Sequence, residues 1–274
     1  MVGNCATMRS ILLFLTLAST CFGQFLSNEP LPERGSPGYG IRDDFVTVAY
    51  SSAGGETWSW VNNPTGLTGV LSNGATSGSS GYFIGAGSGA NANTPFVHLG
   101  NNNANPWAFV TESFSFSLWV KRTGAPTATG SCPNGFSYLL ASDSNGAGWS
   151  LYTARTNDLR FTCYTNSASS LGVSVITNSV LTLNDWHHIV GTRSAGTVKL
   201  YLDGSPVGTN YSAAFSVIAY TTGTSKNCKI GRDSCGSNYY GWPGFIDDVI
   251  VWSNAVLTAA EVLELYEKTK PYHN

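Results

Sequence analysis

The sequence predicts an all-β protein that ends in one short helix. From residue 41 onward, short segments of alternating apolar and polar residues are separated by Gly, Asn, Ser and Asp, which is the pattern of strands and turns. Charged residues make up 11% of the chain, against about a quarter in typical globular proteins. Only one stretch, close to the C-terminus, has apolar residues at helical spacing. A chain of 274 residues is compatible with a single all-β sandwich.

Strands are expected along the whole of this region. In residues 114–122, FSFSLWVKR, apolar side chains at alternate positions share one face, while Ser, Trp and Lys share the other. We expect one face of this strand to be buried. Further strands are predicted at residues 45–50, 80–85, 137–142, 148–154, 159–165, 172–177, 186–193, 227–232 and 244–252.

A hairpin is predicted in residues 197–209. In TVKLYLDG, apolar residues alternate with Lys199 and Tyr201, and the strand ends at Asp203-Gly204, a dipeptide typical of two-residue hairpin turns. The returning strand is expected from Pro206.

The predicted helix covers residues 258–268, TAAEVLELYEK. Thr258 and Glu261 stand at the spacing of a capping box. Apolar residues then recur at helical spacing, namely Val262, Leu265 and Tyr266. We interpret this segment as a packing helix at the edge of the sandwich.

The N-terminal residues predict export. Residues 1–23 have the basic Arg9, an apolar run and a small-residue cleavage site, which together are typical of a signal peptide. A lipoprotein acylated at Cys21 is the alternative. Residues 24–40 contain three prolines in QFLSNEPLPERGSP and are predicted to be an extended leader, followed by one domain over 41–274. No other run approaches the roughly 18 apolar residues of a membrane span. We expect a secreted, extracellular protein.

Charge excludes some partners. Removing Arg9 with the signal peptide reduces the 14 basic residues to 13, against 16 acidic residues, and no basic cluster is present. Nucleic acids and anionic membranes require a concentrated positive patch, so neither is an expected partner.

Four of the six cysteines remain after signal removal, and an even number in an exported protein predicts two disulfides. Three pairings are open. We favour Cys132 with Cys163 and Cys228 with Cys235, for which loop closure alone gives roughly 3.7 and 2.5 kcal/mol. Zinc is disfavoured, because no C-x-x-C spacing occurs.

Two adjacent histidines occur in DWHHIVGTR, residues 185–193. Successive side chains of a strand point to opposite faces, so Trp186 and His188 share one face and His187 lies on the other. The two imidazoles then cannot bind one ion, and we interpret this segment as a packed strand.

Three segments resemble laminin G-like domains of the concanavalin A-like lectin/glucanase superfamily. WHHIVGTRSAGTVKLYLDGSPV is similar to the tryptophan-histidine strand and hairpin of that family, FVTESFSFSLWVKR to an earlier strand, and GFIDDVIVWSNAVLTAAEVLELYE to its closing strand and helix. The resemblance implies a jelly-roll sandwich of two antiparallel sheets with binding loops at the rim. The same fold hosts lectins, adhesion modules, glycosidases and lyases, so it implies no single activity.

Catalytic patterns are missing from the sequence. Glycosidases place two carboxylates about 5 Å or more apart, and on this fold these lie on alternate strand residues. None of the 16 acidic residues has another acid two positions away, and Asp247-Asp248 should point to opposite faces, one of them accepting from backbone donors. No G-x-S-x-G motif occurs, and the glycines at 85, 87 and 89 lack the helix that phosphate binding requires. We therefore predict no catalytic residue.

Two predicted loops combine the aromatic and polar side chains that bind sugars, residues 142–149 and 232–242. The candidate ligand-binding residues are Trp149, Asn238, Tyr239, Tyr240 and Trp242. Laminin G-like domains often bind calcium at the rim, so the resemblance implies a calcium site there. Asp143 and Asp233, the aspartates of the two loops, are the candidate ligands. Asn210 begins an N-x-S acceptor for an N-glycan in a eukaryotic host.

We predict a secreted, non-catalytic module that binds a glycan, matrix polysaccharide or glycoprotein, with calcium as the one cofactor considered. A structural component of an extracellular matrix, such as a shell, wall or skeletal matrix, is the first alternative. A polysaccharide hydrolase or lyase is the second.

Overall fold

A computed structural model describes residues 39–42, 46–51, 59–60, 69–72, 76–77, 83–85, 95–99, 107–124, 135–142, 147–154, 158–165, 172–178, 181–213, 217–220, 228–235 and 238–273. All of them belong to the unit Arg34–Asn274, the second of two units into which the chain divides. The expected signal peptide lies outside the described residues. No helix in the described part of the chain is long and apolar enough to cross a membrane.

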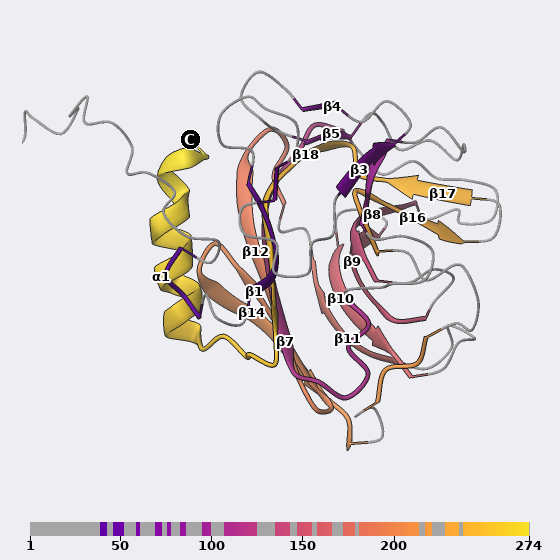
Figure 1. The fold of residues 1–274 in the computed structure, drawn as a ribbon, viewed down its shortest axis with the longest axis vertical. Coiled ribbons are helices and arrows are strands. Elements are labelled where there is room, and N and C mark those ends of the chain that lie inside the picture. Colours follow the sequence, from indigo (N-terminus) through magenta and orange to yellow (C-terminus); the bar gives the residue numbers. More distant parts are fainter. Residues whose placement is uncertain are drawn as a thin grey trace, which may run out of the picture. The chain divides into compact units, whose positions relative to one another are not determined.

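The larger sheet has nine strands, and seven of them follow the order β14-β13-β12-β7-β18-β1-β2, while β5 pairs with β18 and β4 with β5 (Figure 1). Every pairing in it is antiparallel. Its strands are β1 (Val46–Ser51), β2 (Ser59–Trp60), β4 (Thr76–Ser77), β5 (Phe83–Gly85), β7 (Phe114–Arg122), β12 (Trp186–Ser194), β13 (Thr197–Leu202), β14 (Ser205–Tyr211) and β18 (Gly244–Ser253).

The second sheet has seven antiparallel strands in the order β11-β10-β9-β8-β15-β6-β3. Its strands are β3 (Gly69–Ser72), β6 (Phe96–Leu99), β8 (Phe136–Ala141), β9 (Trp149–Ala154), β10 (Asp158–Tyr164), β11 (Gly172–Thr177) and β15 (Cys228–Ile230). A separate ribbon pairs β16 (Arg232–Cys235) with β17 (Asn238–Gly241), where the sequence predicted a loop. The predicted all-β sandwich of two antiparallel sheets is confirmed.

An aromatic core fills the space between the two sheets. Phe114 and Phe116 of β7 pack against Trp149 of β9 and Phe161 of β10, with ring centroids 4.9 to 6.1 Å apart. A Cβ atom at Gly191 of β12 would lie 2.1 Å from the Phe116 ring, so only glycine fits opposite this ring. The inward face predicted for residues 114–122 is confirmed.

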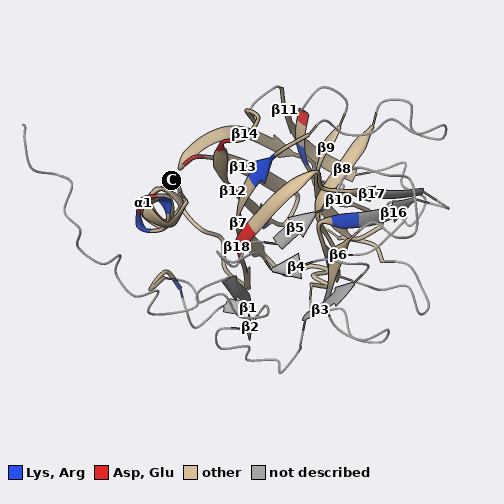
Figure 2. Ribbon diagram, turned by 90° about the horizontal axis from the view of Figure 1, so that it is seen from above, with Lys and Arg blue, Asp and Glu red and all other residues tan. Residues whose placement is uncertain are grey.

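The helix α1 (Ala259–Thr269) packs on the outer face of the nine-stranded sheet, on the side away from β8 to β10 (Figure 2). Its predicted capping box is confirmed, because Thr258 and Glu261 each accept from the other's backbone N–H. Val262 and Leu265 are buried against Val190 and other residues of the sheet. A short 3-10 turn, η3 (Lys270–Tyr272), follows the helix.

This helix corrects one expectation about β7. Ser115, Ser117 and Trp119 were expected on an open face, yet their exposed fractions are 0%, 1% and 3%. Both faces of the strand are therefore buried, because α1 and the segment that leads into it cover the second one.

The predicted hairpin is confirmed. Asp203 and Gly204 join β13 to β14 with φ angles of 48° and 78°, and positive values at both central residues are those of a type I′ turn.

The cysteines do not follow the favoured pairing at Cys163. This residue is a free thiol, fully buried in the core between the sheets, so the bridge to Cys132 is not formed in this structure. Burial raises the pKa of the Cys163 thiol to about 12, which makes it unreactive. Cys132 lies outside the described residues, as does the side chain of Cys235. The pairing of Cys228 with Cys235 stays a prediction.

Candidate functional site

Three of the predicted sugar-binding aromatic residues are core residues. The exposed fractions of Trp149, Trp242 and Tyr240 are 0%, 0% and 2%. The indole Nε1–H of Trp149 donates to the Trp107 carbonyl at 3.0 Å, and that of Trp242 donates to the Phe245 carbonyl at 3.2 Å. Their ring faces are covered by protein, so the prediction that they stack on a sugar is wrong for this structure.

The other predicted site residues remain untested. Asp233, Asn238 and Tyr239 belong to the β16–β17 ribbon, where Asp233 pairs with Tyr240, but their side chains lie outside the described residues. Asp143 also lies outside them. Their roles in binding sugar or calcium stay predictions.

The described residues of the two predicted loops lie near opposite ends of β8. The Tyr240 ring lies 5.7 Å from Phe136 and 6.3 Å from Tyr138, at the start of β8. Asp143 follows Ser142, immediately beyond the end of the same strand. A strand of this length spans roughly 17 Å, so Tyr240 and Ser142 lie near opposite ends of β8.

The outer face of the seven-stranded sheet carries aromatic side chains that the sequence did not single out. Phe136 and Tyr138 of β8 are partly exposed, and Tyr138 pairs across the strands with Tyr152 of β9. The rings of Tyr138 and Tyr152 stack with centroids 4.9 Å apart. The Phe136 ring is covered edge-on by Tyr240. Period-two alternation predicts such a face, but not which of the two faces of a strand is the outer one.

A row of hydroxyl groups continues from this aromatic pair across the next two strands. The Oγ1 atom of Thr162 on β10 lies 3.5 Å from the Oη atom of Tyr152 and 2.9 Å from the Oγ atom of Ser174 on β11. We call Tyr152, Thr162 and Ser174 the hydroxyl row. Tyr152 and Thr162 are largely covered, while Ser174 is partly exposed, as is Tyr138 at the other end.

A charged pair lies beside the hydroxyl row. A guanidinium N–H of the partly exposed Arg160 donates to Asp158 at 3.2 Å. Hydroxyls both donate and accept, and a guanidinium donates, so this face can bond the hydroxyls of a sugar.

The adjacent histidines point to opposite sides of β12, as predicted. The Nδ1 atom of His187 lies 2.9 Å from Oδ2 of Asp203, whose Oδ1 accepts the backbone N–H of His188 at 2.8 Å. The His188 ring is buried, with Nε2 2.8 Å from the hydroxyl of Ser117, and burial lowers the pKa of His188 to about 3. Burial opposes ionisation of Asp203, but its hydrogen bonds with His187 and His188 lower its pKa overall. The histidines are structural.

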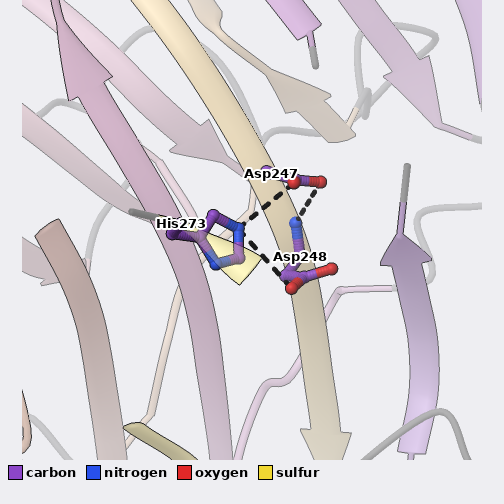
Figure 3. Close-up of side chains that lie close together, drawn as sticks. All are labelled: Asp247, Asp248 and His273. Carbon is purple, nitrogen blue, oxygen red and sulfur yellow. Dashed lines mark hydrogen bonds and ion pairs between the residues drawn. The ribbon is translucent and has the colours of Figure 1, made fainter. Parts of the chain in front are cut away.

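Asp247 and Asp248 differ from the prediction. The register of β18 against β7 shifts after Asp247, and Asp248 has a φ of 45°, so this bulge turns both carboxylates toward one imidazole (Figure 3). The Nε2 atom of His273 lies 3.2 Å from Oδ2 of Asp247 and 3.6 Å from Oδ2 of Asp248. We call these three residues the aspartate-histidine cluster. As expected, one aspartate accepts from a backbone donor, because Oδ1 of Asp247 bonds the Asp248 N–H at 2.8 Å.

The chemistry of the aspartate-histidine cluster is limited by burial. Its three side chains are 0%, 0% and 1% exposed for His273, Asp247 and Asp248, so no substrate reaches them. Their candidate ligand atoms lie within 4.8 Å of one another. However, a structural zinc site takes four ligands, and Oδ2 of Asp248 already accepts from the hydroxyl of Tyr39 at 2.8 Å. The described groups form a hydrogen-bonded cluster rather than a metal centre.

The predicted glycan acceptor is on the surface. Asn210 is exposed on β14, and its amide Nδ2 donates to the Ser174 carbonyl at 2.7 Å. Glycosylation at Asn210 would have to rearrange this bond, and it stays a prediction.

Comparisons with known proteins identify the class of this fold. Residues 91–263 match a laminin G model of the concanavalin A-like lectin/glucanases superfamily. This match covers more than half of the chain, and the chain belongs to this superfamily. A comparison with curated proteins gives no match.

Solved structures with the same fold are binding domains of botulinum neurotoxins. The binding domain of neurotoxin DC in complex with SialylT has 14% sequence identity and a TM-score of 0.60, covering 82% of this chain and 51% of that one. The same domain in complex with rat synaptotagmin II has 16% identity and a TM-score of 0.61, with 82% and 51% covered. A structure of neurotoxin type C, whose cell entry is dependent upon interaction with two ganglioside molecules, has 16% identity and a TM-score of 0.58, with 82% and 51% covered. The chain spans about half the length of these structures, and the likeness shows the fold.

Proposed function

We propose that this protein is a non-catalytic module that binds a glycan on the outer face of the seven-stranded sheet. The observation that carries the proposal is the hydroxyl row, which links hydroxyls of Tyr152, Thr162 and Ser174 across three adjacent strands. A sugar needs paired donors and acceptors for its hydroxyls and apolar contact for its ring. The partly exposed Ser174, Tyr138 and Arg160 supply these on the same face.

Two further observations support the proposal. Among the neurotoxin structures that share the fold, one binding domain is in complex with SialylT, and the cell entry of neurotoxin type C depends on interaction with two ganglioside molecules. In addition, β8 to β11 carry a single acidic residue, Asp158, and it is paired with Arg160. Hydrolysis of a glycosidic bond uses two carboxylates about 5 to 9.5 Å apart. A binding role therefore fits this face better than catalysis.

Secretion and calcium belong to the same proposal. The signal sequence expected in residues 1–23 supports export, and Asp143 and Asp233 are the candidate calcium ligands.

The experiment is a glycan-array screen of the secreted chain, in millimolar calcium and again with chelator. Thr162→Val keeps the side-chain shape but removes the central hydroxyl that orients the other two, and we expect at least a tenfold loss of affinity. Thr197→Val, in β13 of the other sheet, is the matched control and should bind as the wild type does.

The outcomes separate the alternatives. Equal binding by both variants would place the glycan elsewhere. A folded protein that binds no glycan would contradict the proposal and favour a structural matrix role, while soluble products released from a polysaccharide would show an enzyme. Loss of binding with chelator would establish calcium in the site.

A further inference from the structure

The hydrogen bonds of His273 require an extra proton in the aspartate-histidine cluster. The Nδ1 atom of His273 lies 3.1 Å from the backbone carbonyl oxygen of Thr269. A carbonyl oxygen only accepts, so Nδ1 carries a hydrogen and donates it. In a neutral imidazole, the other nitrogen is then a bare acceptor.

That second nitrogen faces acceptors as well. Nε2 lies 3.2 Å from Oδ2 of Asp247 and 3.6 Å from Oδ2 of Asp248, and all three side chains are buried (Figure 3). Lone pairs that face each other without a hydrogen between them are strongly unfavourable away from water. A proton therefore lies on Nε2 or on a carboxyl oxygen. In both cases, the cluster holds one proton more than a neutral histidine and two ionised aspartates.

The surroundings favour a positively charged ring. The indole of Trp119 stacks on the His273 ring with centroids 4.3 Å apart and planes 3° apart, and an aromatic face attracts a cation. Tyr39 donates its hydroxyl to Asp248 at 2.8 Å, which stabilises the carboxylate. His188, on the same indole, is kept neutral because burial lowers its pKa to about 3, and the charge of His273 adds to this.

Every described element around His273 contributes a group that bears on its charge. β18 contributes Asp247 and Asp248, β7 contributes Trp119, β12 contributes Trp186 and His188, α1 contributes the Thr269 carbonyl, and residues 39–42 contribute the Tyr39 hydroxyl. The nearest described lysine along the chain, Lys270, has its ammonium over the Tyr266 ring at 5.2 Å.

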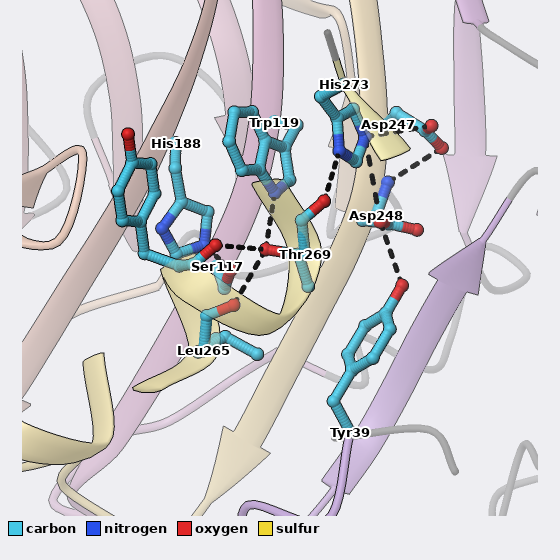
Figure 4. A network of polar contacts seen from close by, with 10 residues as sticks. Tyr39, Ser117, Trp119, His188, Asp247, Asp248, Leu265, Thr269 and His273 are labelled. Carbon is cyan, nitrogen blue, oxygen red and sulfur yellow. Dashed lines mark hydrogen bonds and ion pairs between the residues drawn. The ribbon is translucent and has the colours of Figure 1, made fainter. Parts of the chain in front are cut away.

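The cluster also joins separate parts of the chain (Figure 4). Asp247 and Asp248 belong to the sheet, whereas His273 follows η3 at the end of the helical segment. A second link lies beside it, because the indole N–H of Trp119 donates to the hydroxyl of Thr269 at 2.9 Å. Docking of α1 and η3 on the sheet therefore brings His273 to the two carboxylates.

We propose that the aspartate-histidine cluster is a proton-dependent lock that holds α1 and η3 on the nine-stranded sheet and opens as the pH rises. A free histidine loses its charge above about pH 6.5, so release of the segment frees one proton at higher pH. By linkage, the equilibrium constant for release or unfolding rises up to about tenfold per pH unit above that value. Below about pH 6.5, the folded and the released states both hold the proton, so the lock adds no pH dependence to stability.

The test compares unfolding by urea between pH 6.5 and 8.5 for the wild type and Asp247→Asn. In this variant the new amide Nδ2–H donates to Nε2 of His273, while Oδ1 still accepts the Asp248 N–H. The cluster then needs no extra proton. We expect the unfolding constant of the wild type to rise at least about tenfold more over this range than that of Asp247→Asn.

Asp158→Asn is the matched control, since it neutralises a partly exposed aspartate paired with Arg160, and it should keep the wild-type slope. Equal slopes in the wild type and Asp247→Asn would overturn the proposal. Because Asp247→Asn can fail to fold, nitrogen-15 NMR of histidine-labelled wild type provides a second test.

At about pH 7.5, above the ordinary histidine value, the NMR spectrum should show His273 with hydrogen on both ring nitrogens, or with Nε2 bonded to a protonated carboxyl. A bare Nε2 beside two ionised carboxylates would contradict the lock. A stoichiometric metal that survives dialysis, and whose removal by chelator shifts the His273 signals, would also contradict it and establish a metal site instead.

Discussion

The two outer faces of the sandwich are built from similar alternating strands, yet one is covered by a helix and the other stays partly exposed. On the nine-stranded sheet, Ser115, Ser117 and His188 are at most 1% exposed, because α1 and the segment that leads into it cover them. On the seven-stranded sheet, Tyr138 and Ser174 remain partly exposed. Polar residues on the first face are bonded within the protein and hold a helix. On the second face Tyr152 and Thr162 are largely covered, but Ser174 and Arg160 stay partly exposed and accessible to a ligand. The covering element, more than the residue types, decides the role of a face.

The largest effect is expected in the interior that separates these faces. Trp149→Ala should lower the free energy of unfolding by about 3 to 5 kcal/mol, because the ring is fully buried against Phe114, Phe116 and Phe161. Tyr138→Ala, on the partly exposed face of the neighbouring strand, should cost clearly less. Urea denaturation measures both, and a similar cost for the two variants would contradict the assignment of Trp149 to the core.

The next effect tests the cover of the nine-stranded sheet. Leu265→Ala should lower the unfolding free energy by about 2 to 4 kcal/mol, since this side chain of α1 is fully buried against the sheet. Leu263 lies on the same helix and is 49% exposed, so Leu263→Ala is the matched control and should change stability by less than about 1 kcal/mol. Equal effects in thermal or urea denaturation would show that α1 does not pack as described.

His188, on the covered face, should make the stability of the protein fall in acid. Burial lowers the pKa of His188 to about 3, against an ordinary value of 6.5, so the folded state keeps this ring neutral. The unfolded chain takes up its proton first, and stability is therefore lost as the pH falls from about 6.5 toward 3. As the pH falls over this range, the unfolding constant of His188→Gln should rise less steeply than that of the wild type. The difference is up to about tenfold per pH unit. An unchanged acid slope would show that His188 is accessible to protons when folded.

Local patterns predicted the elements, and tertiary packing decided the sites. The Asp203-Gly204 turn, the capping box of α1 and the opposite faces of the two histidines follow from short-range geometry, and each is confirmed. The convergence of Asp247 and Asp248 did not follow, because a bulge breaks the alternation on which the prediction depended. Trp149 was assigned to a binding loop because alternation cannot tell which face of a strand meets the second sheet. The sequence of a single strand also does not indicate whether a helix from a distant part of the chain will cover it.

The smallest effect on stability, and the most informative for function, concerns the hydroxyl row. Thr162→Val removes one hydroxyl bonded to Ser174 at 2.9 Å, and exchange of one such bond costs about 1 kcal/mol. Glycan affinity should fall at least tenfold at the same time. A residue whose loss weakens binding more than it weakens the fold belongs to a ligand site, so the ratio of the two effects, from calorimetry and urea denaturation on one sample, distinguishes this face from the covered one. If Thr162→Val instead lost several kcal/mol of stability, the row would be a structural network like that around His188.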